Sequence, residues 1–172
     1  MLNRTSELAI RTMLFLALEG NDKPMSPKVI AESLECSPTY LSKTTGLLVR
    51  AGLLRSLRGT NGGVLLSRGP GRITLLEIIS ACQGLMIPNF CESDLASHYT
   101  CAFHRAMLEL YQRTVETLSH WTLARILERP VSPQTLSDGH QCRMRFKGCD
   151  DLVEPASSRG TNFEATQKGG EP

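Results

Sequence analysis

Apolar residues recur every three or four positions in the first third of the chain, and this spacing predicts three helices in succession. The first runs over about residues 6–18. The second and third each begin at a Ser-Pro pair, at 26–27 and 37–38, where the hydroxyl can cap free amides and proline fits the first helical position. Only residues 35–36 separate the second helix from the third, which ends at Gly52. Two helices in such close succession predict a helix-turn-helix.

The pattern then changes to two short apolar runs, residues 53–57 and 63–67, on either side of a glycine-rich basic segment. Such an arrangement predicts a β-hairpin whose tip is formed by residues 58–62. A hairpin beside a helix-turn-helix is typical of a winged helix, in which the second helix enters the major groove of DNA and the hairpin reaches the backbone or the minor groove.

Helical spacing returns after the hairpin. Thr74 caps a short helix that Gly84 ends, and a long helix runs from Cys101 to about residue 119, followed by one or two turns at 122–127. In the long helix, apolar residues follow the three-then-four spacing of a helix that packs against a partner; they are Leu108, Tyr111, Val115 and Leu118.

These elements define a mainly α-helical fold in four parts. We expect a winged helix-turn-helix DNA-binding domain over residues 1–84, a loop over 85–100, a dimerisation helix region over 101–128 and a tail over 129–172. The tail is rich in Pro, Ser and Gly and lacks periodicity, which predicts disorder.

Charge favours DNA as the partner of the first part. Residues 1–72 carry ten Lys and Arg against five Asp and Glu, whereas the net charge of the whole chain is only +2. No phosphate-binding loop or nucleophile elbow is recognisable, so an enzyme using a Cys/His pair is disfavoured. Charged residues interrupt the first apolar run, which therefore fits neither a secretory signal nor a membrane span, and we expect a cytoplasmic protein.

The candidate contacts to DNA lie at the start of the third helix and at the hairpin tip. Short polar or basic side chains there are suited to a groove or to phosphates, and the glycines allow close approach of the backbone. The residues are Ser37, Thr39, Tyr40, Ser42, Lys43, Arg58, Gly59, Asn61 and Gly62.

The six cysteines of a cytoplasmic chain favour metal binding or redox chemistry over structural disulfides. Cys101 and His104 lie one turn apart at the start of the long helix, on the stripe of the apolar seam, and Cys91 lies ten residues upstream. The helix dipole favours a thiolate at that position, and a thiolate is a soft metal ligand. The plain alternative is that Cys101 is a buried apolar thiol and His104 a surface residue.

The remaining cysteines have simpler interpretations. Cys36 and Cys82 fit small packing residues. In the tail, His140, Cys142 and Cys149 match no strong zinc spacing, and we expect disorder there.

Four stretches carry a more specific resemblance, and it covers about residues 1–127. They are Tyr-Leu-Ser-Lys at 40–43, the run at 48–54, the hairpin motif Arg-Gly-x-x-Gly-Gly at 58–63, and Ile-Thr-Leu-Leu-Glu-Ile-Ile at 73–79. In these the chain resembles the IscR/NsrR family of bacterial winged-helix regulators. The resemblance implies a homodimer that binds a palindromic DNA operator, acts as a repressor, and in many members carries an iron–sulfur cluster that sets DNA affinity.

The resemblance also implies a ligand set. Cys91 and Cys101 match the first and last cluster cysteines, His104 matches a histidine ligand of some members, and Glu7 falls where an acidic ligand from the partner's first helix occurs. The middle cysteine is absent, with only His98 near its place, so the set favours a 2Fe-2S cluster over a four-iron one. An exposed acid on an amphipathic helix is the plain alternative for Glu7. The alternative for the protein is a cluster-free regulator controlled by thiol oxidation or by a protein partner.

Overall fold

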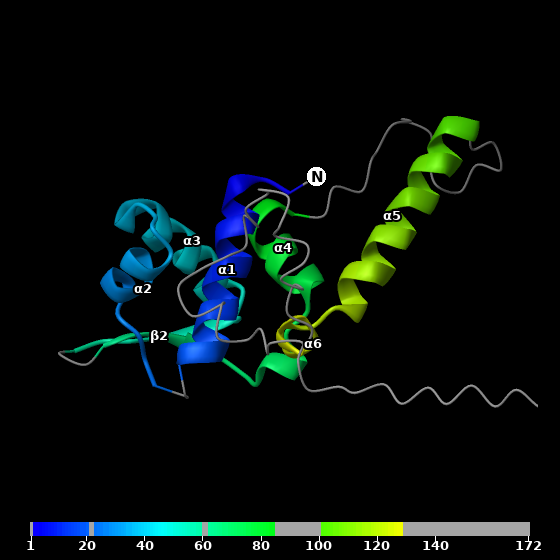
Figure 1. Cartoon of the computed structure of the whole chain (residues 1–172). Helices are drawn as coiled ribbons and strands as arrows, with labels where there is room; N and C mark the ends of the chain where they lie inside the picture. Colours follow the sequence, from blue (N-terminus) through cyan, green and yellow to red (C-terminus); the bar gives the residue numbers. More distant parts are fainter. Residues whose placement is uncertain (1, 21–22, 60–61, 85–100, 129–172) are drawn as a thin grey trace, which may run out of the picture.

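The structure is a computed structural model that describes residues 2–20, 23–59, 62–84 and 101–128. It confirms a mainly helical fold with one two-stranded antiparallel hairpin in this part of the chain (Figure 1). The elements in chain order are α1 (Arg4–Glu19), α2 (Pro27–Ser33), α3 (Pro38–Arg50), β1 (Leu54–Leu57), β2 (Gly63–Leu66), the 3-10 turn η1 (Pro70–Arg72), α4 (Leu75–Gln83), α5 (Ala102–His120) and α6 (Leu123–Leu127). The predicted loop at 85–100 and the tail after residue 128 lie outside the described residues.

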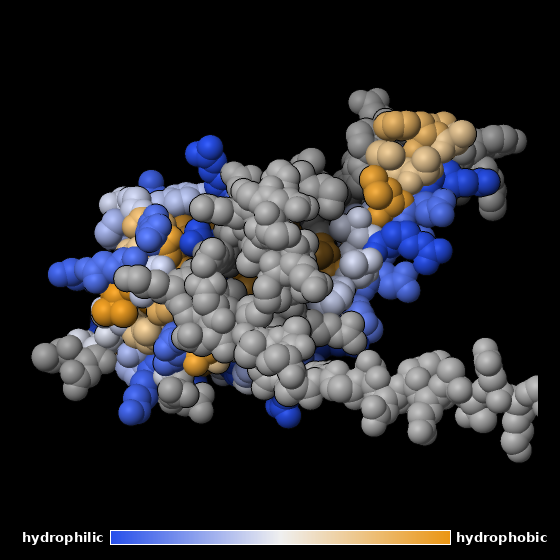
Figure 2. Space-filling view, in the orientation of Figure 1, coloured by the Kyte–Doolittle hydropathy of each residue, from blue (hydrophilic) through white to orange (hydrophobic). Residues whose placement is uncertain are grey.

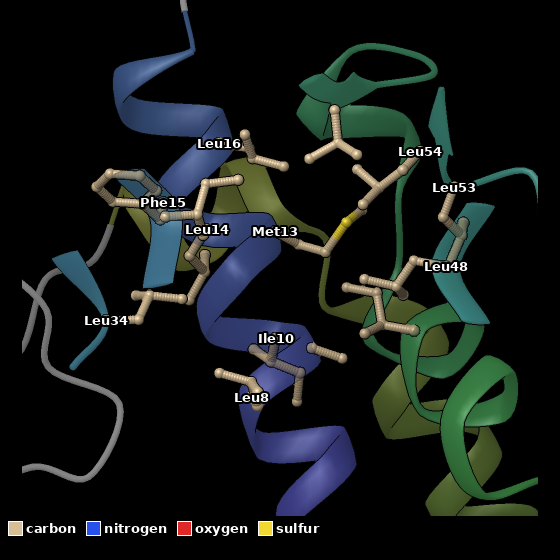
Figure 3. Close-up of a cluster of buried hydrophobic side chains, with 14 of the residues drawn as sticks. Leu8, Ile10, Met13, Leu14, Phe15, Leu16, Leu34, Leu48, Leu53 and Leu54 are labelled. Carbon is tan, nitrogen blue, oxygen red and sulfur yellow. The ribbon is translucent and has the colours of Figure 1, made fainter. Parts of the chain in front are cut away.

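Helix α1 is the centre of the core. Asn3 caps it by accepting a hydrogen bond from the backbone N–H of Ser6, and the helix then packs against α3, α4, α6 and β2. The sequence predicted one apolar face, but Ile10, Leu14 and Phe15 are buried as well, because neighbours surround the helix on most sides (Figure 3). The other elements are therefore positioned relative to α1.

The helix-turn-helix consists of α2 and α3, as predicted. Ser26 caps α2 by accepting a hydrogen bond from the N–H of Val29 at 3.3 Å. Ser37 was expected to cap α3 in the same way, but its side chain makes no capping hydrogen bond, and Pro38 at the first helical position defines the start instead. Leu34 and Leu41 are almost completely buried and hold both helices against the core.

The hairpin pairs Leu54 with Leu66 and Leu57 with Gly63, which confirms the predicted wing. Its inner strand is extended by Met25, which exchanges two backbone hydrogen bonds of 2.9 Å with Val64. A Cβ atom at Gly63 would collide with the Met25 backbone, so this contact requires glycine. The wing is thus attached to the body along β2.

The last described segment of the chain, residues 121–128, packs against the winged-helix domain. Thr74 and Thr122 form an isolated β-bridge, the N–H of Leu75 donates to the Trp121 carbonyl at 2.8 Å, and Leu123 of α6 is fully buried in the core. Helix α5 contacts α4, and its first turns lie away from the other elements (Figure 1). The body that carries the DNA-reading elements therefore also contains α6.

Candidate DNA-binding surface and metal ligands

The start of α3 presents polar side chains to solvent. Ser37, Thr39, Ser42 and Lys43 are all exposed, while Leu41 and Thr44 face the core. Helical periodicity places Thr39, Ser42 and Lys43 together on the outer face of the helix, and Ser37 is the exposed N-cap residue that precedes it. The surface predicted to meet DNA is accessible in the folded protein.

Tyr40 differs from these four residues. It is half-buried, and its hydroxyl forms a 2.9 Å hydrogen bond with the hydroxyl of Thr5 in the first turn of α1. The phenol is therefore directed toward the body and links α3 to α1.

The wing tip requires glycine for its shape. Gly59 has a φ of 111°, a conformation that side chains with a Cβ rarely adopt. A Cβ at Gly62 would stand 2.6 Å from the Leu57 carbonyl oxygen. Arg58 is exposed beside these glycines, and Asn61, the other predicted contact at the tip, lies outside the described residues.

Cys101 and His104 meet at the start of α5. The Cys101 sulfur caps this helix by accepting a hydrogen bond from the His104 backbone N–H at 3.3 Å. Cys101 is exposed, whereas His104 is only 9% exposed. The arrangement is the reverse of the plain alternative, which expected a buried Cys101 and a surface His104.

The His104 ring carries an unsatisfied atom. Its Nδ1 is buried and has no hydrogen-bond partner among the described residues. Leaving a buried polar atom unpaired costs about 1–3 kcal/mol, so such atoms are rare without an unseen partner. A nitrogen ligand one turn from a thiol sulfur is a donor set that suits iron or zinc.

Glu7, the other predicted ligand among the described residues, does not join this pair within one protomer. Within the described ranges no three metal-ligating side chains come together, so one protomer does not bring Glu7 to Cys101 and His104. Glu7 is half-buried and borders a shallow hollow between α1 and the turn of the helix-turn-helix. Cys91 and His98 lie outside the described residues, as do His140, Cys142 and Cys149.

Cys36 and Cys82 have the packing role that the sequence predicted. Both are half-buried against the core. Burial raises the pKa of the Cys82 thiol, and it raises that of Cys36 despite the opposing positive charge of Arg11. Both thiols are therefore poor nucleophiles at neutral pH.

One face of α5 is apolar and exposed. Leu108, Tyr111, Val115 and Leu118, the predicted seam, are all half-buried, whereas Phe103 and Leu110, seven residues apart on a different stripe of the helix, are 57% and 59% exposed. Figure 2 shows apolar surface gathered at the end of α5 far from α6. Among the described residues no helix has the length and apolar composition that a membrane span requires.

Two polar residues of the site were missed by the sequence analysis. The side-chain carbonyl of Gln83, at the end of α4, accepts hydrogen bonds from the Asn3 N–H at 3.1 Å and from the Ser6 hydroxyl at 2.8 Å. Thr5 binds Tyr40 as described above. The Asn-x-x-Ser spacing at the start of α1 indicates a helix cap. Nothing in the sequence indicates the role of Gln83, because its partners are about 80 residues away.

The exposed polar start of α3, the wing beside it and the α1–α4 core together define a winged helix-turn-helix DNA-binding protein. The sequence model of the Rrf2 family, described as an iron-dependent transcriptional regulator, matches residues 2–129. The chain therefore belongs to the Rrf2 family of transcription regulators, and the resemblance to IscR and NsrR and the expectation of a regulator without enzymatic activity are confirmed.

Known proteins of similar sequence and structure support this assignment to the Rrf2 family. The HTH-type transcriptional regulator YffB of Lactococcus lactis is 32% identical over 130 residues, which cover 71% of this chain and 83% of YffB. The structure of CymR, the global cysteine regulator of B. subtilis, is similar with a TM-score of 0.60 and 27% identity, covering 72% of this chain and 93% of CymR. IscR of T. potens shares the fold, with a TM-score of 0.61 and 24% identity over 83% of this chain and 92% of IscR.

Proposed function

We propose that this regulator is a cytoplasmic homodimer that represses transcription by binding a palindromic operator in double-stranded DNA. A two-fold dimer presents two copies of α3, and a palindrome repeats the half-site with the same symmetry. The proposed contacts on each copy are Ser37, Thr39, Tyr40, Ser42, Lys43, Arg58, Gly59, Asn61 and Gly62. The observation that supports this surface is the exposure of the polar face of α3 while its apolar face is buried.

The two protomers would meet along α5. A single chain leaves Phe103 and Leu110 more than half exposed on a long helix, and apolar residues at that spacing are covered when two such helices pack together. The division of the chain at residues 84, 100 and 128 follows from this proposal, with residues 101–128 forming the dimerisation region.

We further propose that Cys91, Cys101 and His104 of one protomer and Glu7 of the other hold an iron–sulfur cluster of the 2Fe-2S type. The single observation that carries this proposal is the buried Nδ1 of His104, which has no hydrogen-bond partner among the described residues, on the residue whose backbone N–H donates to the Cys101 sulfur. When bound, such a cluster supplies sensitivity to redox state, nitric oxide and iron–sulfur supply. Glu7 belongs to α1, which packs behind α3, so its engagement by the partner would fix the relative placement of the two α3 helices.

The DNA surface is tested by the salt dependence of binding. Replacing Lys43 with Ala removes one cation from the exposed face of α3, and we expect the slope of log K against log salt to fall by about one. Lys28, exposed on α2, provides the matched control, because Lys28→Ala changes the same charge outside the proposed contact surface. An equal effect of both variants would contradict the assignment of α3.

The metal site is tested by the visible absorption spectrum and the iron and sulfide content of anaerobically purified protein. We expect charge-transfer bands with iron and sulfide in the wild type and in Cys36→Ala, which removes a thiol that is not among the proposed ligands. We expect Cys101→Ala and His104→Ala to lose both signals. Colourless wild-type protein produced with adequate iron would overturn the cluster proposal.

The second candidate is a regulator without a cluster that responds through its thiols or a protein partner. It is favoured by the similarity to CymR, a global cysteine regulator, and by the exposure of Cys101. Iron-free protein in which mild peroxide modifies Cys101 and changes DNA affinity would support this candidate.

A further inference from the structure

A closed set of polar contacts joins the end of α4 to the start of α1. The Gln83 side-chain carbonyl accepts from the Asn3 N–H and from the Ser6 hydroxyl, while the Ser6 N–H donates to the Asn3 side chain at 2.8 Å. Ser6 is completely buried, so its hydroxyl has no access to water as a substitute partner. A displacement of the Gln83 side chain would therefore also displace the first turn of α1.

The same turn of α1 is bound to the recognition helix. Thr5, the neighbour of Ser6, shares a 2.9 Å hydrogen bond with the Tyr40 hydroxyl. Tyr40 lies in the first turn of α3, where the exposed polar face begins. Two adjacent residues thus connect α1 to α4 on one side and to α3 on the other.

Gln83 is the last residue of α4, and the chain continues from it toward Cys91. We propose that Gln83 is a positioning residue, which acts through Ser6 and Thr5 on Tyr40 and so sets the orientation of the first turn of α3. This connection transmits the position of the end of α4 to the DNA-reading face of α3. Its role in regulation therefore rests on the proposed function.

The connection is tested by amide hydrogen exchange of the full-length protein, measured with and without its metal. The amides of interest are in residues 41–45 of α3; the first of them, Leu41, donates to the Ser37 carbonyl at 2.9 Å. In Gln83→Leu we expect exchange there to rise about three- to tenfold, because the hydrogen bonds that Gln83 accepts from Asn3 and Ser6 are lost. In Gln83→Glu, which keeps an acceptor oxygen at the same place, we expect wild-type exchange.

A second set of variants in the same exchange experiment removes hydroxyl groups nearer to α3. Tyr40→Phe and Thr5→Val remove the same hydrogen bond while keeping side-chain shape, so we expect equal increases in exchange and no further increase in the double variant. Thr5→Ser keeps a hydroxyl and should restore protection. This set remains informative if Gln83→Leu does not fold.

Exchange that rises only in α1 and α4 of Gln83→Leu, or additive effects of Thr5→Val and Tyr40→Phe, would overturn the proposal. Because the measurement is made on metal-free protein as well, its result does not depend on a cluster. Protein without iron would contradict the proposed cluster but not the positioning role of Gln83. Increased exchange confined to α1 and α4 would contradict the positioning role but not the cluster.

Discussion

The guanidinium of Arg68 forms an ion pair with the carboxylate of Glu77, which joins the segment after the wing to the first turn of α4. Glu77 also completes a capping box, because its other carboxylate oxygen accepts from the Thr74 N–H at 2.9 Å. The Arg68 Nε–H donates to the Arg72 carbonyl as well. One carboxylate therefore fixes both the start of α4 and the exit from the wing.

We predict a small energy for the ion pair itself. The Arg68 and Glu77 side chains are 33% and 42% exposed, so solvent screens their attraction, and a double-mutant cycle of Arg68→Gln and Glu77→Gln should give about 0.5 kcal/mol of coupling. Thr74→Ala, which removes the cap, should cost about 1 kcal/mol in urea unfolding. A coupling above about 2 kcal/mol would show that the pair is far less solvated than its exposure indicates.

Leu123 provides a test of the finding that α6 belongs to the core. Its side chain is fully buried, and Leu123→Ala should lower the free energy of unfolding by about 2–5 kcal/mol. The matched control is Leu57→Ala, because Leu57 is 51% exposed on the wing and its truncation should change stability by no more than about 0.5 kcal/mol. Equal effects of the two variants would contradict the packing of α6 against α1.

The exposed apolar face of α5 leads to a prediction about assembly. Leu110→Glu places a charge where the proposed dimer buries a leucine, and sedimentation velocity should show a shift from dimer to monomer. Gln112→Glu introduces the same charge at an exposed polar position of the same helix and should remain dimeric. A wild-type monomer, or dissociation by both variants, would contradict packing through Leu110.

Thiol reactivity should show that the fold protects the packing cysteines Cys36 and Cys82. Burial raises the pKa of Cys36 and Cys82, which reduces the thiolate fraction at any given pH and moves their alkylation profiles to higher pH. Peptide mass spectrometry after iodoacetamide treatment at pH 7 should show slower labelling of these two than of the same residues in urea-unfolded protein. Equal rates in folded and unfolded protein would show that neither thiol is protected.

The sequence was sufficient for the order and type of the elements. Ser-Pro starts, the Thr74 cap and glycine at 59, 62 and 63 are local signals, and the structure uses nearly all of them as expected. Ser37 is the exception, since its hydroxyl makes no capping bond. A local pattern allows a cap without requiring it, because proline at the first helical position defines the same start.

Relationships between distant residues were not predictable. Periodicity placed Cys101 and His104 on one stripe, but only the fold shows that the cysteine is exposed and the histidine buried. Likewise, Tyr40 belongs to a polar helix start, yet its hydroxyl bonds to Thr5, 35 residues away. Such contacts depend on how α1, α3 and α4 pack together, and this information is absent from any local stretch of sequence.

Control of DNA affinity by the site at Cys101 and His104 is the central claim, and its most direct test is operator binding with and without metal. Fluorescence anisotropy with an operator chosen by in vitro selection would compare iron-loaded and iron-free wild type, Cys36→Ala and His104→Ala at one salt concentration. We predict that loading changes affinity about 5- to 150-fold in wild type and Cys36→Ala and leaves His104→Ala unchanged. Equal affinities of loaded and iron-free wild type, or the same ratio in His104→Ala, would contradict the account.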